Sequence, residues 1–421
     1  MSCLSDVLEA REKRRLDIVS LSESNNVVTI KANIPGKNKR IYSAYALTGH
    51  FARLCHREGD GDCQLWDGAD GPTVVFTTSA DPETVKQRCV NLEETHPLGR
   101  FVDLDVWKKG EQKSLSRGYM RRCYICDKPA FVCGRMGGHP IEQLIDVMEK
   151  AVDGYFRQLV EDECINALQQ ELELHPKFGL VTPFTNGSHP DMDYNLMKKA
   201  HRCVAQGIAD MFVVGLKGQD VYRQCVDIGI RTEEQMLIET QGRNAYKGFI
   251  FVAGLLSAAM GQAVASGGGD IYETVSRLVK DIEMGRTETF GDRAYRQYGF
   301  GGVRQHAKEG FPFVRKVADN VQEDSNSKLA QLVCCAAHME DSVMLKRAGS
   351  MEKFKNLQQR FKQLDLSDCR QVDELDGYCI ENNISLGGCA DVLASGIFVK
   401  NVSSKFVLKF DAKQINKEEK K

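Results

Sequence analysis

The sequence predicts an α+β N-terminal domain followed by a larger all-α domain. The main observation is a change in the spacing of apolar residues, which is mixed at first and becomes helical from Ile141 onward. Length agrees, because 421 residues are enough for two or three domains of ordinary size. A hydrophobic content of 42% and a charged content of 27% are typical of soluble globular proteins. We therefore expect domains at residues 1–140 and 141–404 and a lysine-rich tail at 405–421.

Charge and cysteine usage exclude several classes of protein. The net charge of −2 does not indicate the positively charged surface that binds nucleic acid. The polar start MSCLSDVLEAREKRR lacks the apolar segment of a signal peptide. The odd number of cysteines, 15, and the adjacent pair Cys334 and Cys335 favour reduced thiols over disulfides. We expect a cytoplasmic protein that binds neither nucleic acid nor a membrane.

Short apolar runs separated by turns predict three strands and two helices in the first domain. Val27–Ala32 is rich in β-branched residues and is followed by a Pro-Gly turn signal. Pro72–Thr78 is a second strand candidate, and Phe101–Val106, in which apolar and acidic residues alternate, is a third. The helices are expected near Ser5–Ile18 and Asp81–Leu92.

Apolar residues at steps of three and four predict a series of amphipathic helices in the second domain. After the first helix, comparable faces occur at 193–214, 217–237, 270–284, 327–338, 351–364 and 386–399. The uncharged stretch Gly248–Ala265 is barely long enough to span a bilayer. Because it contains Ser257, Gln262 and glycines, and no second such stretch exists, we interpret it as a buried central helix.

The segment His175–Asp193, HPKFGLVTPFTNGSHPDMD, separates two of these helices. It combines ionisable and amide side chains with prolines and glycines, and long loops of this kind are usually functional or disordered. The apolar residues that argue against disorder are Phe178, Leu180, Val181 and Phe184. We therefore expect an ordered active-site loop rather than a structural connector.

Two carboxylates alternate along the third strand candidate. Residues i and i+2 of a strand face the same side, so Asp103 and Asp105 can converge on one hard cation. Mg²⁺ is commonly held by one or two carboxylates together with substrate phosphates. The alternative is a solvent-facing strand edge, since a D-x-D pair often occurs by chance.

A cysteine cluster follows, with the spacing C-x₂-C at Cys123 and Cys126 and then Cys133 and His139. Three cysteines and a histidine can form a zinc site. The alternative is a set of buried small residues beside phosphate-binding arginines, because the spacing departs from common zinc modules.

Three motifs follow one another in the first domain: NIPG (Asn33–Gly36), EETHPLGRFVDLDV (Glu93–Val106) and RRCYICDKPAFVCGR (Arg121–Arg135). In this order they resemble the holo-acyl-carrier-protein synthase of citrate lyase, a phosphoribosyl-dephospho-CoA transferase. The resemblance implies transfer of a prosthetic group to a serine of the acyl carrier protein, with release of pyrophosphate. Such chemistry needs a metal ion, which Asp103 and Asp105 would hold, and positive charge on the phosphates. The arginines suited to the phosphates are Arg100, Arg122 and Arg135.

Six motifs punctuate the second domain. They are PK-x-GLV from Pro176, NGSH-x-DMD from Asn186, T-x-G-x-N-x-x-KG from Thr240, YG-x-x-G-x-R from Tyr298, ED-S from Glu340 and S-x-GG-x-AD from Ser385. In this order they resemble the triphosphoribosyl-dephospho-CoA synthase family, which is all-α. The resemblance implies that ATP is joined to 3′-dephospho-CoA with release of adenine. Members of the two families also occur fused in this order.

The reaction of the second family implies roles for the polar groups of these motifs. The ribose hydroxyl of dephospho-CoA attacks C1′ of the ATP ribose through an oxocarbenium-like transition state, which nearby carboxylates stabilise. Asp191 or Asp193 is expected to be the base, and Glu340 and Asp341 are expected to hold Mg²⁺. The other assignments are Lys177, Lys247 and Arg304 to the triphosphate and Asn186 and His189 to substrate orientation.

Three positions depart from the usual pattern of the second family. Phe178 stands where members have Pro, Tyr246 where they have His, and Val343 where they have Asn. We predict a bifunctional enzyme that makes the prosthetic-group precursor and attaches it to the acyl carrier protein of citrate lyase. Because two polar groups are lost, the alternative is a non-catalytic assembly factor that binds CoA-like nucleotides and the carrier protein. A zinc-containing nucleic-acid-binding protein is a third hypothesis, and the near-neutral charge opposes it.

Overall fold

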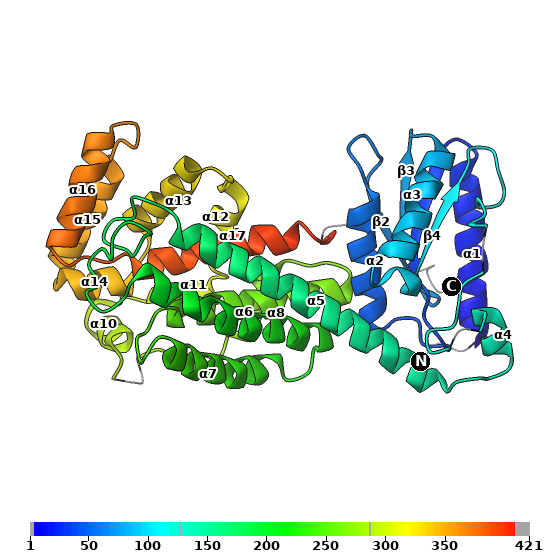
Figure 1. Ribbon diagram of the computed structural model, residues 1–421, viewed down its shortest axis with the longest axis horizontal. Helices are drawn as coiled ribbons and strands as arrows, with labels where there is room; N and C mark the ends of the chain where they lie inside the picture. The colour runs from blue at the N-terminus through cyan, green and yellow to red at the C-terminus, as the bar shows by residue number, and fades with distance from the viewer. Residues whose placement is uncertain (1–3, 119, 127, 286–287, 409–421) are drawn as a thin grey trace, which may run out of the picture. The chain divides into compact units, whose positions relative to one another are not determined.

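The computed structural model describes residues 4–118, 120–126, 128–285 and 288–408 (Figure 1). The described chain has a small antiparallel sheet near its N-terminus and is helical after it, so it is α+β first and all-α later. It divides into two compact units. The first unit comprises the described parts of residues 1–156, 262–269 and 403–421, and the second comprises those of 157–261 and 270–402.

The sheet of the first unit has the strand order β2-β3-β1-β4, and each neighbouring pair is antiparallel. The strands are β1 (Asn26–Ala32), β2 (Gln64–Gly68), β3 (Gly71–Thr78) and β4 (Val102–Trp107). The three predicted strands are confirmed as β1, β3 and β4. β2 is absent from the predicted strands because its sequence, QLWDG, is short and mostly polar, and its pairing with β3 through a tight turn defines it.

Helices cover both faces of this sheet. Figure 1 shows α1 (Leu4–Ser22) on one side and α2 (Tyr42–Cys55) on the other. On the α1 side, Ile18 packs with Val27 and Val75 in a buried apolar cluster. The predicted helix near Ser5–Ile18 is therefore confirmed, whereas α2 has no counterpart among the predicted helices.

The edge strand β4 is protected by α3 (Pro82–Thr95), which the sequence also predicts. Lys86 Nζ donates to the carbonyl of Leu104 at 2.9 Å, and the N–H of Leu104 donates to Glu93 Oε1 at 2.8 Å. Unpaired backbone groups at a strand edge would otherwise invite another chain to pair. Two ionisable side chains are thus buried beside β4.

The short helix α4 (Ala130–Arg135) precedes the long helix α5 (Ile141–Leu172). α5 begins where the helical pattern of the sequence begins, but its first half belongs to the first unit. Tyr155 bonds to His96 Nε2 at 3.0 Å, and Asp153 accepts from Tyr42 at 2.9 Å. The compact first unit therefore extends past residue 140 to residue 156.

Residues 405–408, which the sequence places in the tail, also pack on the first unit. Phe406 is buried and its ring lies 5.1 Å from that of Phe156. His50 Nδ1 lies 2.9 Å from the carbonyl oxygen of Lys405. The sequence KFVLKF at residues 405–410 has the apolar pattern of a strand, but residues 405–408 do not form one. The rest of the predicted tail lies outside the described residues.

The second unit is built from helices alone within the described residues. They are the second half of α5, α6 (Tyr194–Lys217), α7 (Val221–Glu239), most of α8 (Lys247–Ser266), α9 (Ile271–Leu278), α10 (Phe290–Tyr298), α11 (Gly302–Lys308), α12 (Pro312–Asn320), α13 (Ser325–His338), α14 (Ser342–Ala348), α15 (Met351–Gln363), α16 (Cys369–Glu381) and most of α17 (Gly387–Ser403). The predicted amphipathic faces appear as α6, α7, α9, α13, α15 and α17.

α8 is the predicted buried central helix. It is the one helix in the described chain that is long and apolar enough to cross a membrane, and 78% of its apolar window is buried inside the protein. Glycines let α6 approach it closely: a Cβ on Gly215 would lie 2.1 Å from the carbonyl oxygen of Ala258. The burial confirms the prediction of a core helix.

Candidate functional sites

β4 places Asp103 and Asp105 on one face of the sheet, because its residues alternate between buried and half-buried. The Asp103 carboxylate pairs with Arg117 Nη2 and Arg121 Nη2, each at 2.9 Å. Asp105 Oδ1 lies 3.7 Å from Lys86 Nζ. Burial and the neighbouring Asp103 charge raise the pKa of Asp105. The two carboxylates therefore share one electrostatic environment, as the strand spacing predicts.

A buried ion-pair cluster lies on the same face. Lys31 of β1 is the register partner of Asp103, and its ammonium pairs with Asp70 at 2.9 Å. Arg14 of α1 also pairs with Asp70. Burial and the Arg14 charge lower the pKa of Lys31 to about 8. Positive charge thus reaches this face from both α1 and β1.

A cavity of about 570 Å³ adjoins the short 3-10 helix η1 (Gly99–Phe101). It is lined by Glu93, Glu94, Gly99, Arg100, Met120, Arg121, Arg122, Cys123, Tyr124, Ile125 and Cys126. The structure therefore brings Arg100 and Arg122 together with Arg121. Arg135 is not among the lining residues and lies over the Phe131 ring at 5.9 Å.

Glu93 is the buried acid of this cavity; it begins the motif EETHPLGRFVDLDV, but it is not among the predicted site residues. Its Oε1 pairs with Arg121 Nη2 at 2.7 Å, while its Oε2 is buried without a hydrogen-bond partner. Burial raises the pKa of Glu93 to about 7, although the N–H of Leu104 and the charge of Arg117 lower it. A glutamate in a helix usually faces solvent, so only the fold reveals this group.

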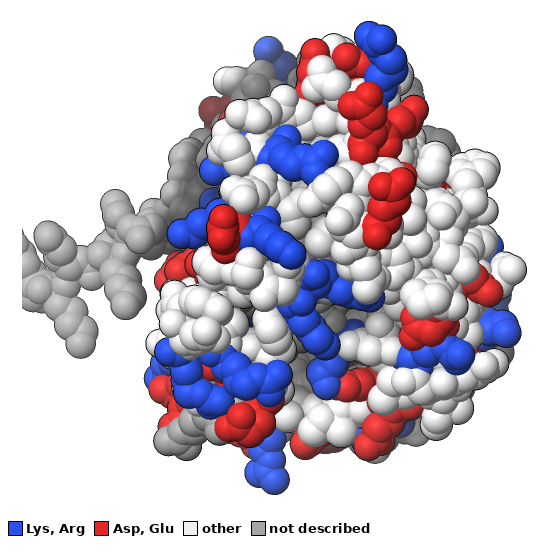
Figure 2. All heavy atoms as spheres, turned by 90° about the vertical axis from the view of Figure 1, so that its left-hand side faces the viewer, with Lys and Arg blue, Asp and Glu red and all other residues white. Residues whose placement is uncertain are grey.

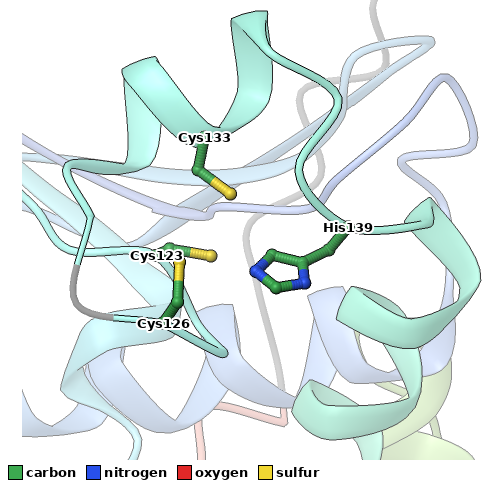
Figure 3. Close-up of side chains that lie close together, drawn as sticks. All are labelled: Cys123, Cys126, Cys133 and His139. Atoms are coloured by element: carbon green, nitrogen blue, oxygen red, sulfur yellow. The ribbon is translucent and has the colours of Figure 1, made fainter.

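The cysteine cluster comes together in space. The ligand atoms of Cys123, Cys126, Cys133 and His139 all lie within 4.8 Å of one another. Figure 3 shows the four side chains pointing toward a common centre, with Cys133 on α4 and His139 just before α5. Cys123 and Cys133 are buried.

In the second unit, the loop His175–Asp193 is held against the segment that precedes α17. Ser188 Oγ donates to the carbonyl of Ile384 at 2.6 Å, and His189 Nε2 lies 3.0 Å from Ser385 Oγ. The N–H of Gly179 donates to Asp376 at 3.1 Å. The loop is therefore ordered, as the sequence predicts.

His189 belongs to a polar group at the surface of this loop. Arg347 Nη1 donates to Asn383 Oδ1 at 2.6 Å, and Arg347 Nη2 lies 3.5 Å from His189 Nδ1. Burial and the Arg347 charge lower the pKa of His189, so the imidazole is neutral near pH 7. Arg347 is therefore a further cation beside His189, and it is not among the predicted site residues.

The neighbouring acids of the loop have different environments. Asp191 is exposed, and within the described chain its carboxylate makes no hydrogen bond or ion pair. Asp193 caps α6, because its carboxylate accepts the N–H of Leu196 at 2.8 Å. Asn186 is exposed, and its carbonyl accepts the N–H of His189 at 3.1 Å.

The three cations predicted to meet the triphosphate all have carboxylate partners. Lys177 is 2% exposed, and its ammonium donates to Glu171 Oε1 at 2.8 Å. Arg304 pairs with Asp292 at 2.8 Å, and the exposed Lys247 pairs with Glu233. Lys177 therefore lies in a buried ion pair, and its assignment to the triphosphate stays a prediction.

The carboxylates of Glu340 and Asp341 both accept backbone N–H groups. Glu340 Oε2 accepts the N–H of Gly301 at 2.8 Å. Asp341 is buried; its Oδ1 accepts N–H groups of α14, and its Oδ2 accepts the N–H of Cys389 in α17 at 2.9 Å. Asp341 therefore joins the starts of two helices, and its predicted Mg²⁺ role stays a prediction.

Two of the three residues that depart from the family pattern, Tyr246 and Val343, contact other residues of the unit. The Tyr246 hydroxyl lies 2.9 Å from His201 Nε2 in the core. A Cβ on Gly387 would lie 3.3 Å from Val343 Cγ1, so the valine packs against the start of α17. Both residues stabilise the unit from within.

Basic side chains gather at the end of this unit that carries α10, α14, α15 and α16. Figure 2 shows a band of Lys and Arg through the middle of that face. A surface of this kind attracts anionic ligands.

Comparison with known proteins matches both units. The model of the family ATP:dephospho-CoA triphosphoribosyl transferase, CitG, matches residues 158–410. The chain belongs to the CitG family. Residues 2–155 match the family apo-citrate lyase phosphoribosyl-dephospho-CoA transferase, CitX. The chain is therefore a transferase of citrate lyase prosthetic-group biosynthesis, with a CitX domain and a CitG domain.

Its relatives include proteins with the same fused organisation. Protein CitXG of Leuconostoc mesenteroides subsp. cremoris is 28% identical over 94% of this chain and 95% of its own length. Protein CitXG of Haemophilus influenzae is 27% identical over 78% of this chain and 79% of its own length. The 2-(5''-triphosphoribosyl)-3'-dephosphocoenzyme-A synthase of Haemophilus ducreyi is 26% identical over 65% of this chain and 98% of its own length. The predicted fusion is confirmed.

Proposed function

We propose that this chain carries out two consecutive steps. The CitG domain joins ATP to 3′-dephospho-CoA and releases adenine. The CitX domain then transfers the phosphoribosyl-dephospho-CoA group to a serine of the acyl carrier protein of citrate lyase and releases pyrophosphate. The observation that carries the proposal is the match of both family models in one chain. Tethering the domains raises the local concentration of the shared intermediate.

In the CitX domain, the cavity beside η1 is the proposed site of transfer. Arg100, Arg121 and Arg122 line it and suit the triphosphate, because guanidinium groups bind phosphate oxygens bidentately. Glu93 is proposed as the base that accepts the serine proton. Its Oε2 atom makes no hydrogen bond and lies 3.9 Å from Arg117 Nη1, and this oxygen and the pKa of about 7 suit proton transfer at neutral pH.

Asp103 and Asp105 are the proposed ligands of a Mg²⁺ ion. Burial and the Asp103 charge raise the pKa of Asp105, and a divalent cation would offset both effects, so the donor set fits. When bound, the ion would neutralise charge on the phosphates. Asp103 would have to share its carboxylate with Arg117 and Arg121.

Glu93→Gln is expected to slow carrier-protein modification by about 10²-fold or more, the usual contribution of a general base. Gln keeps an acceptor for the N–H of Leu104 but cannot take a proton. In the wild type, the rate should rise with pH and level off above about 7, because only the ionised carboxylate is a base. Lys86, Asp103, Arg117 and Arg121 face this group and set its titration.

The measurement is a pH profile of carrier-protein modification at saturating adduct. Glu94→Gln, an exposed neighbour in the same cavity wall, is the matched control and should keep the wild-type profile. A folded Glu93→Gln variant with an unchanged rate and profile would remove Glu93 from the mechanism.

In the CitG domain, the proposed site is the surface formed by the loop His175–Asp193 and the segment before α17. Asp191 is the proposed base for the ribose hydroxyl, since its carboxylate is exposed and makes no hydrogen bond or ion pair in the described chain, although its charge acts on His189. The neutral His189 and the cation Arg347 would orient the substrate and meet its phosphates. Asn186, Lys247 and Arg304 are proposed as further substrate contacts.

The second candidate is a non-catalytic assembly factor that binds nucleotide and carrier protein. It is favoured by the packing roles of Tyr246 and Val343, which stand where relatives are expected to have polar groups. A binder consumes no ATP and releases no adenine, so turnover separates the two candidates.

The whole reaction is tested by incubating the chain with ATP, Mg²⁺, 3′-dephospho-CoA and the apo carrier protein. The intact mass of the carrier should increase by one phosphoribosyl-dephospho-CoA group. A carrier protein in which the acceptor serine is replaced by alanine is the control and should keep its mass. An unmodified wild-type carrier, with the enzyme folded, contradicts the transfer step.

A further inference from the structure

We propose that Cys123, Cys126, Cys133 and His139 form a zinc site that fixes the arginine-bearing wall of the CitX cavity. The consequence for catalysis rests on the proposed transfer function, whereas the metal site itself does not.

The first argument is convergence from separate parts of the chain. Two thiols come from the loop at 123–126, one from α4, and the imidazole from the residue two positions before α5. All four ligand atoms lie within 4.8 Å of one another. A tetrahedral zinc ion with Zn–S bonds of about 2.3 Å needs its ligand atoms about 3.5–4 Å apart. Small side-chain movements would therefore close the site.

The second argument is the backbone around the cluster. The N–H groups of Ile125 and Cys126 donate to Cys123 Sγ, so the backbone of this loop folds around the sulfur. The N–H of Cys123 donates to the carbonyl of Lys128 at 2.9 Å, and the N–H of Ala130 donates to the carbonyl of Arg121 at 2.8 Å. The loop is thus a tight hairpin whose tip presents two thiols together.

Two glycines let the chain turn back so that His139 reaches the thiols. Gly137 has a φ of 59°, a left-handed conformation that side chains seldom adopt. A Cβ on Gly138 would lie 2.9 Å from Cys133 Sγ. Chance burial of small residues requires neither the imidazole in this position nor this close approach.

The zinc ligands and the phosphate-binding arginines share one segment. Arg121, Arg122, Cys123 and Cys126 all line the cavity. Arg100 also donates to the carbonyl of Cys123. A zinc ion holding Cys123 and Cys126 would therefore fix the backbone from which Arg121 and Arg122 extend. Loss of the ion should leave the fold of the CitG domain intact.

The test is the metal content of the full-length chain, purified without chelators and then equilibrated with zinc and dialysed. We expect one zinc ion per chain by mass spectrometry of the metals. Replacement of zinc by Co²⁺ should give the absorption of a tetrahedral cobalt–thiolate site. Cys126→Ser should lose the bound zinc and the cobalt spectrum. Cys63→Ser, a half-buried cysteine of the same unit outside the cluster, should retain both.

Two results would overturn the proposal. One is a folded wild-type chain that holds no zinc and gives no tetrahedral cobalt spectrum. The other is equal zinc content in wild type and Cys126→Ser. Activity gives a separate readout: removing zinc should abolish carrier-protein modification while adenine release is unchanged. If zinc binds but neither step occurs in any form of the chain, the proposed function fails and the metal site stands.

Discussion

Asp191→Asn is expected to slow adenine release by about 10²-fold or more, because a general base contributes this much to proton transfer. Asn keeps the size and polarity of the side chain but cannot accept the proton of the ribose hydroxyl. Asp191 is exposed, and no described group binds its carboxylate, so its loss should leave the fold unchanged. Adenine is measured by chromatography under saturating ATP and 3′-dephospho-CoA.

Asp193→Asn is the matched control for this variant. Asp193 caps α6 through the N–H of Leu196, and asparagine caps a helix about as well as aspartate. The control therefore removes a negative charge two positions after Asp191 and keeps the N-terminal cap of α6. Near wild-type adenine release by Asp191→Asn, or a larger loss in Asp193→Asn, would assign the base to another residue.

Lys177→Met is expected to destabilise the second unit by about 3–5 kcal/mol, because it leaves Glu171 buried without its partner. The double variant Glu171→Gln with Lys177→Met should recover much of this stability, since no uncompensated charge is then buried. Equal stability of wild type and Lys177→Met would show that the ammonium serves the ligand site and not the core.

The two units can be followed separately during unfolding. The two tryptophans, Trp66 and Trp107, both lie in the first unit, so their fluorescence reports on that unit alone. Circular dichroism of the helices reports mainly on the second unit, which contains most of them. Lys177→Met should lower the denaturant concentration at the midpoint of the dichroism transition and leave the midpoint of the fluorescence transition unchanged.

The spacing of residues along the chain was enough to predict those features of the structure that depend on residues close together in the sequence. The alternation along Phe101–Val106 predicts that Asp103 and Asp105 share a face, and β4 has this geometry. The spacing of the cysteines allowed a metal site, and the ligand atoms do converge. The apolar residues of His175–Asp193 predicted order, and the loop is packed against the start of α17.

Side-chain contacts that depend on the tertiary fold could not be predicted from this spacing. Asp341 has the residue type of a metal ligand, but its carboxylate binds the N–H of Cys389, 48 positions away. Lys177 has the type of a phosphate ligand, but the end of α5 supplies Glu171 beside it. The helical pattern around Glu93 does not indicate that this side chain is buried, because the burial results from the packing of α3 on β4. In each case the contact is made with a residue whose position only the fold defines.

The most direct measurement uses the chain with ATP, Mg²⁺ and 3′-dephospho-CoA, first without and then with the apo carrier protein. Adenine and the triphosphoribosyl adduct should accumulate in equal amounts over many turnovers before any carrier is present. Pyrophosphate should be released only after the carrier is added, in proportion to the carrier modified. A folded, nucleotide-binding chain that releases no adenine would contradict the two-step account and favour the assembly factor.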